Sequence, residues 1–92
     1  MNKKQLIKQI RGISEEIILR HLEYDGRRLS DYFLVGEGGH YQQGTWGHDG
    51  KPQIWMRFSE DEAVDFAVEQ FLLSHVPIYK TAADVPSREP VG

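Results

Sequence analysis

The first quarter of the chain has apolar residues at spacings of three and four, at Leu6, Ile10, Ile13 and Ile17. This period places them on one stripe of an amphipathic helix that runs from about residue 3 to residue 24. Gly12 lies inside the pattern and costs a helix about 1 kcal/mol relative to alanine. We therefore expect the helix to bend or break near residues 12–14, with Ser14 capping a second helical segment.

Residues 31–58 change to the short, alternating pattern of β-strands. We expect three strands, over residues 32–35, 40–46 and 53–58. Glycine-rich residues 36–39 form the first turn, and Asp49-Gly50 gives a strong signal for the second, because both residues tolerate positive φ. The sequence thus predicts a three-stranded antiparallel meander with one face on the core.

In the last predicted strand, Ile54, Met56 and Phe58 alternate with Trp55 and Arg57. Because side chains alternate between the two faces of a strand, the first set is expected to point toward the core. Trp55 and Arg57 are then expected on the opposite face.

A second helix is predicted after the meander. Ser59 followed by Glu62 forms a capping box, and an apolar stripe from Val64 to Leu72 follows. Pro77 ends the helix. Residues 80–92 contain two prolines and few large apolar side chains, so we expect a flexible C-terminal tail there.

Together these elements predict an α+β domain over residues 1–79, built of an N-terminal helix, the meander and a C-terminal helix, with a flexible tail over residues 80–92. At 92 residues the chain has room for one domain. It lacks cysteine, which excludes disulfides, thiolate metal sites and cysteine nucleophiles. It shows neither a signal peptide nor an apolar run long enough to cross a membrane, so a soluble, cytoplasmic protein is expected.

Charge is divided along the chain. Residues 1–30 carry seven Lys/Arg against four Asp/Glu, a net of +3, whereas residues 59–76 carry five Asp/Glu and no Lys/Arg, a net of −5. The acidic block is explained in part by capping and by the solvent-facing side of a helix. The basic block has no such structural explanation, so we expect it to contact a partner first.

The residues point to no reaction. The acids of the second helix lie in no apolar run that would raise a carboxyl pKa, and the serines lie in no nucleophile elbow. His40, His48 and Asp49 offer a weak metal set, and solvent-facing loop histidines explain them better. We therefore expect no catalytic residue, cofactor, metal or small-molecule substrate.

Candidate partner-binding residues are of two kinds: basic residues of the N-terminal third, and aromatic or basic residues of the meander. They are Lys4, Lys8, Arg27, Arg28, Tyr41, Trp46, Lys51, Trp55 and Arg57. Aromatic and arginine side chains dominate interface hot spots. The alternatives are that one tryptophan completes the core while the other lies on the surface, and that the basic residues form a solvated helix face.

As a whole, a small cysteine-free helix–meander–helix chain with divided charge and no active site resembles phage-encoded anti-CRISPR proteins. It most resembles inhibitors of the type I-F crRNA-guided surveillance complex (the Csy, or Cascade, complex). The resemblance implies a non-enzymatic inhibitor in the host cytoplasm that docks on Cas7- or Cas8-type subunits and blocks target-DNA binding or hybridisation. The basic segment would then touch guide-RNA phosphates.

Two other functions fit the same residues. One is an immunity or antitoxin protein whose acidic residues mimic nucleic acid and plug a nuclease toxin. The other is a small RNA-binding module that uses the meander as a stacking platform.

Overall fold

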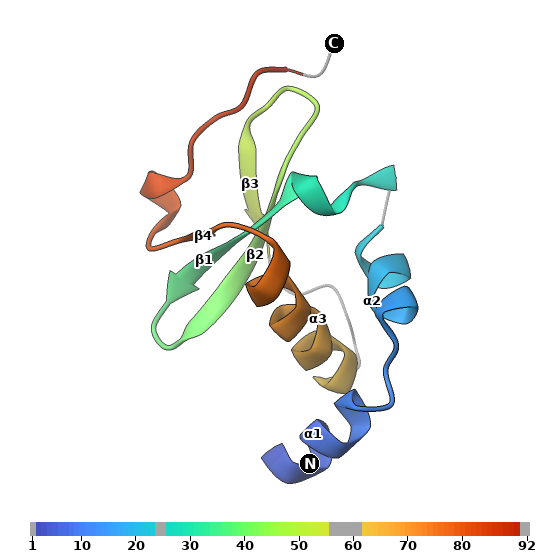
Figure 1. Cartoon of the computed structure of the whole chain (residues 1–92). Helices are drawn as coiled ribbons and strands as arrows, with labels where there is room; N and C mark the ends of the chain where they lie inside the picture. Colours follow the sequence, from blue (N-terminus) through green and yellow to red (C-terminus); the bar gives the residue numbers. More distant parts are fainter. Residues whose placement is uncertain (1, 24–25, 56–61, 91–92) are drawn as a thin grey trace.

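The computed structural model describes residues 2–23, 26–55 and 62–90. Its helices are α1 (Lys3–Ile10), α2 (Glu15–Leu22) and α3 (Glu62–His75), and its strands are β1 (Tyr32–Glu37), β2 (His40–Trp46), β3 (Pro52–Trp55) and β4 (Ile78–Tyr79). Short 3-10 turns cover Leu29–Asp31 (η2) and Ala82–Asp84 (η3). Helices α2 and α3 lie beside one sheet, and α1 packs on α3 at the end of the molecule remote from the β2–β3 hairpin (Figure 1). The predicted α+β class is confirmed.

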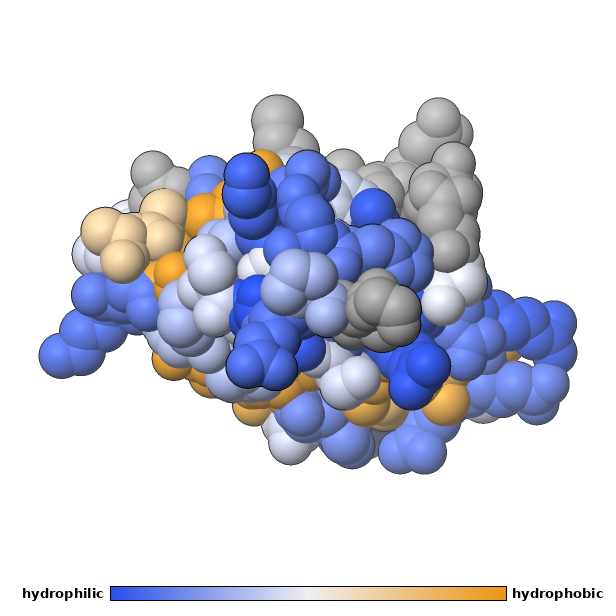
Figure 2. Space-filling view, turned by 90° about the horizontal axis from the view of Figure 1, so that it is seen from above, coloured by the Kyte–Doolittle hydropathy of each residue, from blue (hydrophilic) through white to orange (hydrophobic). Residues whose placement is uncertain are grey.

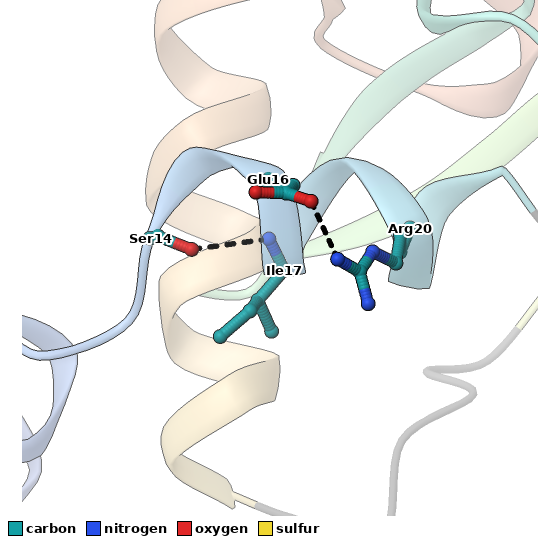
Figure 3. A network of polar contacts seen from close by, with 4 residues as sticks. All are labelled: Ser14, Glu16, Ile17 and Arg20. Carbon is teal, nitrogen blue, oxygen red and sulfur yellow. Dashed lines mark hydrogen bonds and ion pairs between the residues drawn. The ribbon is translucent and has the colours of Figure 1, made fainter.

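The break in the N-terminal helix is confirmed, and local capping explains both halves. Asn2 forms a reciprocal capping box with Gln5 at the start of α1. After the break, the Ser14 hydroxyl accepts a hydrogen bond from the backbone N–H of Ile17 at 3.3 Å (Figure 3). Because these caps satisfy N–H groups that an α-helix leaves open, two eight-residue helices replace one long helix.

The predicted meander is confirmed as the three antiparallel strands β1, β2 and β3. Gly38 and Gly39 form the two-residue β1–β2 turn, with φ values of +54° and +87°. Two consecutive positive φ values match a type I′ turn, which suits the twist of a hairpin. In the β2–β3 loop Gly50 has φ of +78°, and its N–H donates to the carbonyl of Gly47 at 2.9 Å.

A fourth strand, β4, extends the sheet to the order β3-β2-β1-β4. It pairs parallel to β1, with Leu34 opposite Ile78, and the N–H of Leu34 donates to the carbonyl of Pro77 at 3.0 Å. The meander prediction did not include this strand, because two residues carry no measurable period. The connection through α3 returns the chain to the β1 edge.

The sheet has an apolar cluster on each face. On the helix side, Tyr32 and Leu34 pack with residues of α2 and α3, namely Ile18, Leu22, Ala67, Val68 and Leu72. On the other side, Phe33, Val35, Trp46 and Val85 form a second buried cluster. The prediction of a meander with only one face on the core is therefore wrong.

The second face is covered by the segment after β4. Val85 is buried there, the Trp46 indole N–H donates to the carbonyl of Pro86 at 2.8 Å, and the Arg88 guanidinium lies over the Trp46 ring. The expectation of a flexible tail over residues 80–92 did not anticipate this packing of residues 80–90. A single valine among prolines gives no periodic signal, so composition alone suggested disorder.

Helix α3 is covered on more than one side, because it packs against α1, α2 and β1. Asp65 and Glu69 are consequently buried, with exposed fractions of 8% and 9%. For these two residues, this corrects the expectation that the acids of this helix line its solvent-facing side; Glu62 is exposed. The predicted capping box at Ser59, and the side chains of Met56 and Phe58, lie outside the described residues.

Candidate interaction surfaces

A row of exposed cations lies on α1. Lys4, Lys8 and the C-cap residue Arg11 are all exposed and recur at intervals of four and three, so they share one face of the helix. Ile7, with 38% of its surface exposed, lies beside them at the same spacing. We call these four residues the α1 face.

The α1 face has no acidic neighbour on its own helix. The first turn contains no acid, because the cap is made by Asn2 and Gln5 amides instead of carboxylates. None of Lys4, Lys8 and Arg11 forms an ion pair within the described part of the chain. By contrast, Arg20 on α2 pairs with Glu16 one turn earlier (Figure 3). The side chains of Lys4, Lys8 and Arg11 are therefore available to an external anion.

The adjacent arginines Arg27 and Arg28 have different surroundings. The Arg27 guanidinium lies 5.3 Å from the centre of the Trp55 ring and is half-buried. Arg28 is exposed, and its backbone N–H donates to the Asp31 carboxylate at 3.0 Å. Of this pair, Arg28 offers its charge to solvent, whereas Arg27 is partly occupied by a cation–π contact.

The structure does not bring the three candidate aromatic residues onto one exposed face. Tyr41 and Trp55 pack against the helix-side cluster, and the Trp55 indole N–H donates to the Thr45 hydroxyl at 3.2 Å. Trp46 points to the opposite face and is 4% exposed. The expected aromatic–polar binding face is therefore absent from the described residues, because alternation divides these rings between two covered faces.

The two remaining candidates are basic. Lys51 is exposed in the β2–β3 loop. Arg57 lies outside the described residues. Seen from above, the molecule presents mainly hydrophilic residues, and apolar ones show along the lower margin and at the upper left (Figure 2).

Arg88 is a contact residue that sequence reasoning missed. Its guanidinium carbon lies 3.4 Å from the centre of the Trp46 ring. Trp46 is also in edge or tilted contact with Phe33 and Tyr79, at centroid distances of 4.7 and 6.3 Å. A lone arginine in a proline-containing tail has no local signal that places it on a tryptophan more than forty residues away in sequence.

Two buried polar atoms between the sheet and the helices lack hydrogen bonds in the described part of the chain: the Tyr32 hydroxyl and the Gln43 side-chain oxygen. Burial raises the pKa of Tyr32 above its ordinary value of 10.0; nearby Arg27 acts in the opposite sense, and Asp31 and Glu23 add to the increase. The tyrosine therefore stays neutral at physiological pH and supplies neither a base nor an anion.

The described residues contain neither a cluster of metal-binding side chains nor a helix that could span a membrane. Within residues 2–23, 26–55 and 62–90, no three or more His, Asp or Glu side chains gather into a group that could hold a metal ion. His40 and His48 are both exposed. None of the helices in these ranges has the length and apolarity needed to cross a membrane.

Comparison of the chain with protein-family models, with curated proteins and with solved structures found no match.

Proposed function

We propose that this protein is a non-enzymatic inhibitor that binds the type I-F crRNA-guided surveillance complex in the host cytoplasm and prevents it from binding target DNA. The observation that supports this proposal is the α1 face. Lys4, Lys8 and Arg11 project three cations from one end of the molecule, without ion pairs in the described chain. A guide-RNA complex offers anionic phosphates along its length, to which such a row is complementary.

The spacing of the α1 face suits a linear anion. At about 1.5 Å per residue, Lys4 and Arg11 are separated by about 10 Å along the helix axis. Ile7 supplies an apolar contact between the charges. A Cas7-type backbone that holds RNA presents protein and phosphate side by side, so one face can use both kinds of contact.

Two observations count against the alternative functions. An immunity protein that mimics nucleic acid needs a set of exposed acids, but of the described acids of α3 only Glu62 is exposed, whereas Asp65 and Glu69 are buried. An RNA-binding module needs exposed aromatic rings on the sheet, but Trp46 is buried and Trp55 packs against the helix side. The residues of the α1 face, by contrast, are already exposed.

The test is binding of labelled target DNA by the purified surveillance complex, with increasing amounts of the protein. Wild type is expected to reduce DNA binding at stoichiometric amounts, and the triple variant Lys4→Glu/Lys8→Glu/Arg11→Glu to lose at least tenfold in apparent affinity for the complex, roughly what one or two lost charge contacts cause. Lys80→Glu, an exposed lysine directly after β4, is the matched control and should inhibit like wild type.

Wild type that leaves DNA binding unchanged, and does not co-purify with the complex, would exclude the proposed function. Normal inhibition by the triple variant would instead exclude only the α1 face as the contact.

A further inference from the structure

Helix α2 has an exposed face whose charge is opposite to that of the α1 face. Glu16, Arg20 and Glu23 are exposed and recur at intervals of four and three, so they share one side of the helix. Glu15 and Ile17 are exposed beside them. We call these five residues the α2 face. Its three carboxylates and one guanidinium give a net charge of −2, whereas the α1 face has a net charge of +3.

The charges of the two faces have matching spacings. Lys4 and Arg11 are seven residues apart, and so are Glu16 and Glu23. Seven residues correspond to about 10 Å along a helix axis. Two helices that lie side by side can therefore bring both cations against both carboxylates at once, whichever way the helices run. Glu16 already pairs with Arg20 (Figure 3), but its carboxylate has two oxygens and can accept a second donor.

Each face also exposes one isoleucine. Ile17 on α2 has 48% of its surface exposed, and Ile7 on α1 has 38%. Isoleucine is among the residues most often buried in folded proteins. Both helices pack on α3 with their inner sides, so these outer side chains do not contribute to the core. Apolar side chains bordered by charged ones are typical of protein interfaces, which have an apolar centre and a polar rim.

The two faces do not neutralise each other within one chain. Among the residues that the structure describes, no ion pair joins α1 to α2, and the pair between Arg20 and Glu16 lies within α2. A second copy of the chain supplies the complementary face to each helix. In a two-fold symmetric pair, α1 of each copy meets α2 of the other, so every contact forms twice.

We propose that the protein binds a second copy of itself, with the α1 face of each copy against the α2 face of the other. The pairing uses the α1 face but does not depend on the proposed function, because it is a property of the free protein. Where both hold, the second copy and the guide RNA compete for the same cations. The paired form then has to separate before it binds the surveillance complex.

Sedimentation equilibrium of the purified full chain measures this pairing with no other component present. An interface of two short helices from each copy is small, and small interfaces are weak, so the concentration range is about 10 µM to about 1 mM. Wild type should form a reversible dimer within this range at low salt. The dimer should weaken as salt is added, because its charge contacts are exposed and are screened.

Two charge-reversal variants test the arrangement of the helices. The α1 variant Lys4→Glu/Lys8→Glu/Arg11→Glu and the α2 variant Glu16→Lys/Glu23→Lys should each raise the dissociation constant at least about tenfold, because like charges then meet. An equimolar mixture of the two variants should pair about as tightly as wild type. In the mixed pair, each reversed face meets a reversed face and each natural face meets a natural one.

Folding of the variants is checked by circular dichroism. The two changes in the α2 variant have opposite effects on the helix dipole, so α2 should remain folded. If it does not, Glu23→Lys alone, which is favourable at a helix C-terminus, takes its place. Lys80→Glu, an exposed lysine outside both faces, is the matched control and should pair like wild type.

Three results would overturn the proposal. The first is a wild type that stays monomeric up to about 1 mM. The second is a dimer that neither reversal weakens, because another surface would then form it. The third is a mixture of folded variants that does not pair. None of these results decides whether the protein inhibits the surveillance complex, which the DNA-binding assay tests separately.

Discussion

Phe33 lies directly over Gly44, its cross-strand partner in the β1–β2 hairpin. A Cβ placed on Gly44 would be 2.2 Å from the end of the Phe33 ring, which is closer than any two carbon atoms in contact. Phe33 is fully buried and also contacts Trp46, so the ring has no free space into which to move. The missing side chain at residue 44 thus makes room for the aromatic cluster on this face of the sheet.

Gly44→Ala is therefore expected to destabilise the protein by about 1–3 kcal/mol, the range for overpacking a filled core. This is opposite to the usual effect, because glycine within a strand is normally the weaker residue. The measurement is the urea dependence of unfolding.

Gly12→Ala is the matched control, since a Cβ there would lie 3.5 Å from its nearest contact, the Gln9 carbonyl oxygen. Its stability should remain within about 0.5 kcal/mol of wild type, as for most surface substitutions. Equal stability of Gly44→Ala and wild type would contradict the packing of Phe33 on the β2 backbone.

Tyr32→Phe is expected to leave stability unchanged or to increase it by up to about 1 kcal/mol. The Tyr32 hydroxyl is buried without a hydrogen bond in the described part of the chain, so its removal relieves a desolvation penalty and breaks no bond. Chemical unfolding near neutral pH gives the comparison. A loss of more than about 1 kcal/mol would show that the hydroxyl has a partner, such as an internal water.

The same tyrosine gives a prediction for alkaline pH. Burial raises its pKa in the folded protein above the ordinary value of 10.0. Below about pH 10 both states hold the proton, whereas above it the unfolded chain releases the proton first, so stability falls as the pH rises toward the folded-state pKa. Wild type should lose more stability than Tyr32→Phe between about pH 9 and about pH 11.

Tyr41→Phe serves as the control for this titration, because Tyr41 lies on the same face of the sheet but is only partly buried. It should keep the alkaline loss seen in wild type. Identical pH profiles for wild type and Tyr32→Phe would rule out Tyr32 as the titrating group.

Arg27 and Arg28 are adjacent in sequence but have different surroundings, so replacing each with alanine should lower stability by different amounts. Arg27 lies over the Trp55 ring, so its loss is expected to cost about 0.5–1 kcal/mol and to alter tryptophan fluorescence. The Arg28 side chain is exposed, so its loss should change stability by less than about 0.5 kcal/mol. Similar losses in both variants would show that the Trp55 contact contributes nothing specific.

The parts of the fold that sequence predicted are those set by neighbouring residues. Gly12 and Ser14 indicated the helix break, and Asp49-Gly50 indicated a hairpin turn, because capping and positive φ are local requirements. The apolar stripe of α3 was likewise correct, with Val68 and Leu72 buried. For the helix break and the turn, the deciding contact lies within a few residues of the signal.

The missed features depend on contacts between distant segments. Ile54 and Trp55 alternate as predicted, but both faces of the sheet are covered, so alternation cannot identify a binding face. Arg88 reaches Trp46 across the fold, and Asp65 is buried because α1, α2 and β1 surround α3. Within the candidate site, the sequence did predict Lys4 and Lys8, because charged residues that recur at helical spacing indicate an exposed helix face.

Ser14→Ala should destabilise α2 by about 1 kcal/mol, because Ser14 supplies the hydroxyl that accepts from the Ile17 N–H at 3.3 Å. Ser14→Asn, which keeps a capping acceptor, should retain most of the wild-type stability. Ser74→Ala is the control, since that hydroxyl only donates to a carbonyl within α3. Urea unfolding followed by circular dichroism ranks the variants, and equal stability of Ser14→Ala and Ser14→Asn would show that tertiary packing alone fixes the start of α2. An eight-residue helix is too short to be stable in isolation, so we expect the cap to matter.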